Sequence, residues 1–423
     1  MNHTPTRKIP ALSLLLGGLL LVAVAGSAQA GALPSCGLHT GQPATGEPIA
    51  IGAVVGKTGP DDFSTSSSAA RAYFECVNAN GGIHGRPIRY LVADDQWNPE
   101  VAAQVAAKLV KDEKVVALAG NASFVECGAN AKMYEQEGVM AIAGGGVQRE
   151  CFFGRNYVPV NAGPRVSGAN ITAYAADKYK AKKIVCIIPN IPGLGDWACE
   201  GAAGWSRENG IGFDTIAFDP GSADATSTLL RAVAKQPDVI VLNAPKGLLI
   251  ALATAAEQQN LIDKIHFVAP TPAYSVDVPD ALGPAWDGKL EINLEFNPVE
   301  SAGPDNTNWK AVMDRYAGKD VARDSFAQGG YLAARIVTDT LLKMDPARID
   351  RASVTAALRQ VRDFESDILC KPFYVGDGPR HNANTKGPVM VISGQGFKQV
   401  GACMSARDPE LRDIRVYERD HKL

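Results

Sequence analysis

Apolar and polar positions alternate along the chain in two ways, and from them we predict its secondary structure. Continuous apolar runs such as PIAIGAVV at 48–55 are typical of strands that are buried on both faces. Segments such as EVAAQVAAKLVK at 100–111 repeat their apolar residues at helical spacing instead. The first series of such elements predicts strands at 48–55, 88–93, 115–119 and 139–143, and helices at 67–78, 100–111 and 130–137.

A second series begins after residue 168. It predicts helices at 169–178, 198–208, 227–235 and 248–259, and strands at 183–188, 213–218, 239–242 and 265–268. Further helices are predicted near 326–343 and 353–361, followed by a hairpin at 370–400 and a charged segment, 404–423, that forms a solvated tail or a late helix. Strands and helices that alternate with short loops predict an α/β fold with parallel sheets covered by helices on both faces. Two series of similar length predict two Rossmann-like lobes.

The N-terminus indicates export from the cytoplasm. Arg7 and Lys8 precede an apolar stretch at 12–25, and small residues then end in Ala28-Gln29-Ala30. These features are typical of a signal peptide, with cleavage expected after Ala30. Lipid anchoring at Cys36 is the alternative, although Pro34 and Ser35 fit a lipobox poorly.

Charge and cysteine content narrow the class of protein. Signal-peptide removal would lower the formal charge from −3 to −5, and the absence of any basic block argues against nucleic acid as a partner. The eight cysteines contain no C-x-x-C, and the scattered histidines form no cluster with them, so we expect disulfides and no metal. Neighbour order favours the pairs Cys36–Cys76, Cys127–Cys151, Cys186–Cys199 and Cys370–Cys403.

The segment VNANGGIHGRPIRYLVADDQWNP at 77–99 raises two chemical alternatives. Gly81-Gly82 follows a predicted helix and precedes a strand, whereas a phosphate loop follows a strand, so these glycines are expected to cap the helix and form a turn. Asp94 and Asp95 are adjacent in a strand and should face opposite ways, which disfavours joint chelation of a metal. We expect one of them to organise its loop or to cap the helix that begins near Pro99. No G-x-S-x-G, H-E-x-x-H or Walker motif is present, so we expect neither an enzyme nor a cofactor.

Several segments resemble the Leu/Ile/Val-binding family of type I periplasmic solute-binding proteins of ABC transporters. The resemblance rests on 77–99 and on IGAVVGKTGP (51–60), VALAGNASF (116–124), EQEGVMAIAGGG (135–146), KKIVCIIPNIPGLGDWACEG (182–201) and GGYLAARIVTDTLL (329–342). It implies a non-enzymatic, monomeric receptor whose lobes are joined by three crossovers and which docks on an inner-membrane permease. The lobes would comprise 48–162 with about 298–390, and 163–297 with about 391–403, after a lead-in at 31–47.

The resemblance also implies which loops face a cleft between the lobes. In the first lobe these loops hold Thr58, Phe63, Ser64, Asn121, Ser123, Phe124, Gly145, Gly146 and Val147. In the second lobe they hold Trp197, Asn243, Lys246, Thr271 and Tyr274.

One difference from the family bears on the solute. Amino-acid-binding relatives place an acid, which pairs with the ligand ammonium, where this chain has Thr271. An unpaired ammonium in a closed cleft would be costly. We therefore expect an organic acid, bound by Lys246 or Arg149, or else an amide or apolar solute, in place of leucine, isoleucine or valine. A periplasmic sensor that hands its closed state to a signalling partner is the alternative function.

Overall fold

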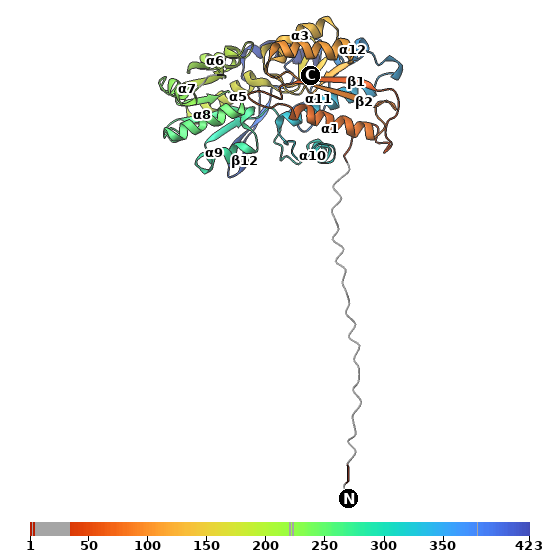
Figure 1. Ribbon diagram of the computed structural model, residues 1–423. Helices are drawn as coiled ribbons and strands as arrows, with labels where there is room; N and C mark the ends of the chain where they lie inside the picture. Colours follow the sequence, from red (N-terminus) through yellow and green to blue (C-terminus); the bar gives the residue numbers. More distant parts are fainter. Residues whose placement is uncertain (2, 5–33, 220, 222–223, 379) are drawn as a thin grey trace. The chain divides into compact units, whose positions relative to one another are not determined.

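The structure is a computed structural model that describes residues 34–219, 221, 224–378 and 380–423, together with residues 1, 3 and 4. The expected signal peptide and its cleavage site after Ala30 lie outside the described residues, except for residues 1, 3 and 4. From Pro34 onward the chain forms one compact unit. Within that unit the strands form two sheets, and each sheet with the helices that cover it is one lobe (Figure 1).

The first lobe is built on a five-stranded parallel sheet in the order β2-β1-β3-β4-β5. Its strands are β1 (Ile49–Val55), β2 (Ile88–Asp94), β3 (Ala117–Ala119), β4 (Ala141–Ala143) and β5 (Tyr157–Pro159). Its helices are α1 (Thr65–Ala79), α2 (Pro99–Ala107), α3 (Glu126–Gln136), α4 (Arg149–Phe153), α10 (Pro304–Tyr316), α11 (Ser325–Leu342) and α12 (Arg351–Arg359). Helix α1 packs on α11, where the Tyr73 and Tyr331 rings lie 5.1 Å apart edge to face. Strands β1, β3, β4 and β5 are buried because helices cover both faces of the sheet, which is why they are almost wholly apolar in sequence. The edge strand β2 is only partly buried and carries exposed Arg89.

The second lobe is built on a seven-stranded sheet in the order β12-β11-β10-β9-β8-β6-β7. Its strands are β6 (Lys183–Pro189), β7 (Gly212–Phe218), β8 (Val239–Leu242), β9 (His266–Pro270), β10 (Leu290–Asn293), β11 (Gly387–Ser393) and β12 (Gly396–Met404). Its helices are α5 (Gly163–Tyr179), α6 (Gly195–Glu208), α7 (Ala225–Val233), α8 (Lys246–Gln258) and α9 (Asp277–Leu282). Strands β6 to β10 are parallel, whereas β11 runs antiparallel to both of its neighbours. The sheet is therefore mixed at the edge where the chain returns.

Several predicted elements need correction. The hairpin does not extend over 370–400, because its strands span only Gly387–Ser393 and Gly396–Met404 and belong to the second sheet. Helix α5 begins at Gly163 instead of residue 169, with a proline in its first turn. Strand β10 was not predicted, because Glu291 interrupts the apolar pattern by which buried strands are recognised. The Glu291 carboxylate can be buried because it accepts hydrogen bonds from Lys178 and from the Tyr179 hydroxyl.

The chain passes between the lobes after β5, after β10 and before β11, which gives the expected hinge of three crossovers. Asn384 of the third crossover ties the other two together. Its Nδ2 donates to Val160 O at 3.0 Å and to Glu295 O at 2.7 Å. The third crossover ends where β11 begins, at Gly387. A Cβ at Gly387 would lie 1.6 Å from Leu294 O, so the two crossovers can approach this closely only with a glycine there.

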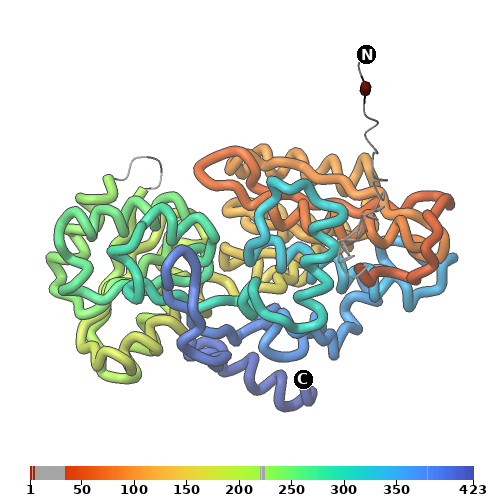
Figure 2. The backbone as a smooth tube through the Cα atoms, turned by 90° about the horizontal axis from the view of Figure 1, so that it is seen from below, coloured from red at the N-terminus to blue at the C-terminus, as the bar shows by residue number. Residues whose placement is uncertain are grey.

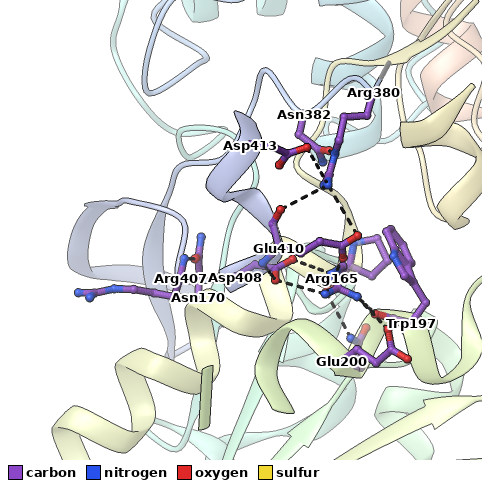
Figure 3. Close-up of polar contacts among 12 residues, drawn as sticks. Arg165, Asn170, Trp197, Glu200, Arg380, Asn382, Arg407, Asp408, Glu410 and Asp413 are labelled. Carbon is purple, nitrogen blue, oxygen red and sulfur yellow. Dashed lines mark hydrogen bonds and ion pairs between the residues drawn. The ribbon is translucent and has the colours of Figure 1, made fainter. Parts of the chain in front are cut away.

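The C-terminal segment, residues 404–423, is not a solvated tail. It ends in α13 (Arg412–His421), as the late-helix alternative expects. Asp408 is fully buried, and its carboxylate accepts from Arg165 Nε at 2.6 Å at the start of α5 (Figure 3). Figure 2 shows this dark blue segment running from the green second lobe toward the first. Ion pairs join Arg412 to Glu208 in the second lobe and Glu418 to Lys371 on the first-lobe side.

The disulfides pair all eight cysteines as neighbour order predicts. Bonds join Cys36 to Cys76, Cys127 to Cys151, Cys186 to Cys199 and Cys370 to Cys403. The first bond fastens the lead-in to α1, and the last fastens β12 to the loop that follows α12. Each therefore stabilises a segment that has little regular structure of its own.

Candidate functional site

A cavity lies between the two lobes, beside the hinge. The first lobe contributes Phe124, Val147 and Phe326, and the second contributes Leu194 and Pro245. Polar side chains come from Asn161 and Glu295 on the crossovers and from Asn243 after β8. A concave, mostly apolar cavity with a few convergent polar groups is the usual form of a small-molecule site.

The lobes contact each other on two sides of this cavity. Gln148 Nε2 donates to Pro192 O at 2.7 Å, and Arg149 N donates to Gly193 O at 2.7 Å. On another side Lys246 N donates to Asp61 Oδ2 at 3.2 Å. Because these contacts join loops of opposite lobes, they must break when the hinge opens. The structure thus has its lobes closed over the cavity.

Asp94 and Asp95 both organise loops. Asp94 accepts from the amides of Lys57 and Thr58 at 3.0 and 3.2 Å, and from the Thr58 hydroxyl at 2.6 Å. Asp95 is fully buried and accepts from Trp97 N at 2.9 Å and from the Ser123 hydroxyl. Helix α2 is capped by Asn98 and not by either aspartate. The expectation that the acidic pair serves the scaffold is confirmed, and both acids serve it.

The structure brings only part of the predicted ligand set to the cavity. The members of the predicted set that line the cavity are Phe124, Gly146, Val147 and Asn243. Phe63, Lys246 and Tyr274 line a pocket beside it, which shares Pro272 and Phe326 with the cavity.

Most of the other predicted ligand residues bond to protein partners. Thr58 and Ser123 are bonded to the two aspartates, Asn121 Nδ2 donates to Glu126, and Thr271 Oγ1 donates to Asn293 O. Gly145 N donates to Asn121 O, and Ser64 precedes α1 as its N-cap without a side-chain cap hydrogen bond. The Trp197 ring is tilted against Phe152 with ring centroids 5.8 Å apart, and its buried Nε1 has no hydrogen-bond partner among the described residues.

Among the cavity residues that sequence analysis missed are Asn161, Glu295 and Phe326. The only signal for Glu295 was an acid within the otherwise apolar run LEINLEF at 290–296. Phe326 opens α11 and joins Phe63 and Phe124 in an aromatic cluster, with ring centroids of neighbouring pairs 4.9 and 5.1 Å apart. Only the crossovers bring these distant segments together.

Comparison with known proteins places this architecture in a family. The sequence profile of the family described as "Periplasmic binding protein" matches residues 48–396. The chain belongs to the periplasmic binding protein family. A curated relative, an amino acid binding protein of Pseudomonas aeruginosa, is 32% identical over 98 residues. That match spans 22% of this chain and about a quarter (26%) of the relative.

Solved structures of periplasmic binding proteins share the fold. A branched-chain amino acid ABC transporter protein from Thermus thermophilus, with bound valine, has a TM-score of 0.76 and 16% identity, over 87% of this chain and all of that one. A fatty acid ABC transporter substrate-binding protein from Thermomonospora curvata has a TM-score of 0.74 and 20% identity, over 88% and 95%. A leucine binding protein from Thermotoga maritima has a TM-score of 0.71 and 18% identity, over 86% and 99%.

The ionisable groups around the cavity of this periplasmic binding protein are mainly acids. Burial raises the pKa of Glu295 to about 7, against the hydrogen bonds from Asn161 and from the Gly163 amide. Burial also raises the pKa of Asp324 to about 6 and that of Asp61 above its ordinary value. Lys246 is the cation of this region, and its Nζ lies 3.0 Å from Asp277 Oδ2. The lysine that was expected to bind an acid is therefore already ion-paired.

Two further findings concern metals and membranes. In the described part of this binding protein, no group of three histidine, cysteine, aspartate or glutamate residues is placed to hold a metal ion. Nor do the described helices include one with the length and apolar character needed to cross a membrane.

Proposed function

We propose that this protein is an extracytoplasmic receptor that encloses a small organic solute between its lobes and delivers it to an ABC importer. The observation that carries the proposal is the interlobe cavity, which contacts from opposite lobes close. Two proteins of similar structure are a branched-chain amino acid ABC transporter protein and a fatty acid ABC transporter substrate-binding protein. A hinge of three crossovers permits closure without unfolding either lobe.

The rest of the proposal concerns location and partners. The chain would lose its signal peptide after Ala30, be released into the periplasm as a monomer, and dock on an inner-membrane permease in its closed form. The disulfide of Cys36 supports release over lipid anchoring, because its sulfur is already bonded to Cys76. Binding alone is proposed, without catalysis, since the cavity residues form no arrangement of nucleophile and base.

Thermal unfolding across a solute panel tests the proposal. The panel holds matched sets of amino acids, carboxylates, amides and amines, and the protein is the mature, oxidised chain. A solute at a hundredfold excess over its Kd should stabilise the fold by about 3 kcal/mol. Val147→Trp, which fills the cavity, should abolish the shift. Val416→Trp at the exposed position on α13 should preserve it. A shift that survives Val147→Trp would place binding elsewhere and refute the proposal.

A further inference from the structure

Glu295 is a buried acid that the fold leaves without a cation. Glu295 is 6% exposed and lines the interlobe cavity. Asn161 Nδ2 donates to both of its carboxylate oxygens, at 3.2 and 3.1 Å, and the Gly163 amide adds a hydrogen bond. A carboxylate has about four acceptor sites, so these donors leave capacity for another partner. In the described part of the chain, the Glu295 carboxylate forms no ion pair.

The surroundings make that isolation unusual. Among the described residues that line the cavity, Glu295 is the sole ionisable group, and the others are mainly aromatic, aliphatic and proline side chains. A buried carboxylate is costly unless it is paired or protonated. Glu291 on the same segment shows the usual solution, because it is buried beside Lys178 and Tyr179. Glu295 lacks such a partner, and it lines a cavity in which a solute could supply one.

The pocket beside the cavity also favours a positively charged solute. It is lined by Asp61, Asp62 and Asp324, and its one lysine, Lys246, is ion-paired with Asp277. It adjoins the cavity through Pro272 and Phe326. A cleft lined by one sign of charge raises the local concentration of solutes that carry the opposite sign.

The donors that would hold an anion in the first lobe are occupied. Gly146 N donates to Asn161 Oδ1 at 2.7 Å, and Val147 N points to Cys151 Sγ at 3.3 Å. The Ser123 hydroxyl donates to Asp95. A solute carboxylate in this cavity would therefore have to displace protein hydrogen bonds and lie near Glu295, which opposes its charge.

We infer that the solute carries a protonated amine that pairs with Glu295, and an apolar body that lies against Phe124, Val147 and Phe326. Aromatic faces favour cations, so the two phenylalanines suit the carbon atoms next to an ammonium group. This inference rests on the proposed receptor function and narrows its solute class to small amines. It replaces the expectation of an organic acid, which depended on Lys246 or Arg149. Lys246 is paired with Asp277, and the Arg149 guanidinium lies 4.0 Å from the Phe153 ring centroid, outside the cavity lining.

Calorimetric titration with matched probes tests the inference. One such set is 3-methylbutylammonium, 3-methylbutanoate and 3-methylbutanamide, and equivalent sets cover shorter and longer chains. The amine should bind more tightly than its carboxylate and amide counterparts. Its affinity should rise about thirtyfold from pH 5.5 to pH 8, because Glu295 loses its proton near pH 7 and only the carboxylate pairs with a cation. A bound carboxylate would show the opposite trend.

Two variants separate a binding role from a structural one. Glu295→Gln should weaken amine binding at pH 8 about thirtyfold or more. It should leave the stability of the free protein at pH 8 equal or higher, since it removes a buried charge. Glu291→Gln, the same change on the same segment but outside the cavity, should leave affinity unchanged. The Glu295→Gln variant retains the ionisable groups of the neighbouring pocket, which are Asp61, Asp62, Asp324 and Lys246. Any pH dependence of amine affinity that persists in this variant is therefore due to those groups.

The outcomes are distinguishable. Tighter binding of the carboxylate or amide, or amine binding that Glu295→Gln does not weaken, would overturn the inference and leave the receptor function standing. If no probe of any chain length bound, the receptor function of this cavity would itself be refuted.

Discussion

The contact between Arg165 and Asp408 joins the hinge to the C-terminal segment, and removing it should destabilise the protein strongly. Asp408 has a side chain that is 0% exposed, and the Arg165 side chain is 8% exposed. The carboxylate accepts from Arg165 Nε at 2.6 Å and Nη2 at 3.3 Å, and also from Glu410 N at 3.0 Å (Figure 3). Asp408→Ala would remove all three hydrogen bonds. The buried Arg165 guanidinium would then be paired only with Glu200 and Glu410, which are more exposed than Asp408.

The magnitude follows from that geometry. Breaking a buried ion pair by removing one partner costs about 3–5 kcal/mol. Glu410 and Glu200 remain within 2.7 and 3.2 Å of Arg165, but they are 35% and 61% exposed and so compensate only in part. We expect Asp408→Ala to lower the free energy of unfolding by about 3 kcal/mol, at the lower end of that range.

Urea unfolding measures this loss as a lower midpoint with an unchanged slope. The matched control is Asp420→Ala, because Asp420 pairs with Arg419 at 3.1 Å on the surface, where the two side chains are 54% and 71% exposed. Such a pair contributes about 0–1 kcal/mol. If Asp408→Ala and Asp420→Ala proved equally mild, the C-terminal segment would not brace the hinge and the reasoning would be refuted.

Three further predictions concern residues outside the cavity. Ser123→Ala should cost about 1–3 kcal/mol in urea unfolding, because buried Asp95 loses its hydroxyl donor. Calorimetry should show unchanged solute affinity, and the reverse result would make Ser123 a ligand. Replacing Cys186 and Cys199 by alanine should cost about 3 kcal/mol, since the bond closes a short loop, and an unchanged Tm would contradict this. Burial raises the pKa of Glu126 to about 7, so wild-type stability should fall from pH 4.5 to 7. Glu126→Gln should flatten that slope in urea titrations, and an identical slope would count against it.

The sequence predicted most of the fold because parallel strands covered on both faces must be continuously apolar. Two features escaped prediction because a polar residue is buried by a distant partner, namely strand β10 and the packing of the C-terminal segment. Strand β10 was missed because it contains Glu291. The partner that allows this acid to be buried, Lys178, lies 113 positions earlier in the chain. Asp408 made the C-terminal segment look solvated because Arg165 lies 243 positions away.

The site was less predictable than the fold for the same reason. Of the loops that the resemblance implies, Phe124, Gly146, Val147 and Asn243 line the cavity, and their role in binding stays a prediction. The resemblance could not show which polar groups remain free. The Ser123 hydroxyl is used by Asp95, and Glu295 reaches the cavity only because the crossovers place it beside Asn161, 134 positions earlier.

The central claim is that the lobes close on a solute, and small-angle X-ray scattering with and without a bound solute tests it most directly. The mature chain would be measured alone and then with the tightest binder of the probe sets at saturation. The account predicts a smaller radius of gyration with solute, and a scattering curve that matches the closed lobes described here. Identical curves at saturation would contradict the claim, because the contacts of Gln148, Arg149 and Asp61 across the cavity would then not depend on the solute.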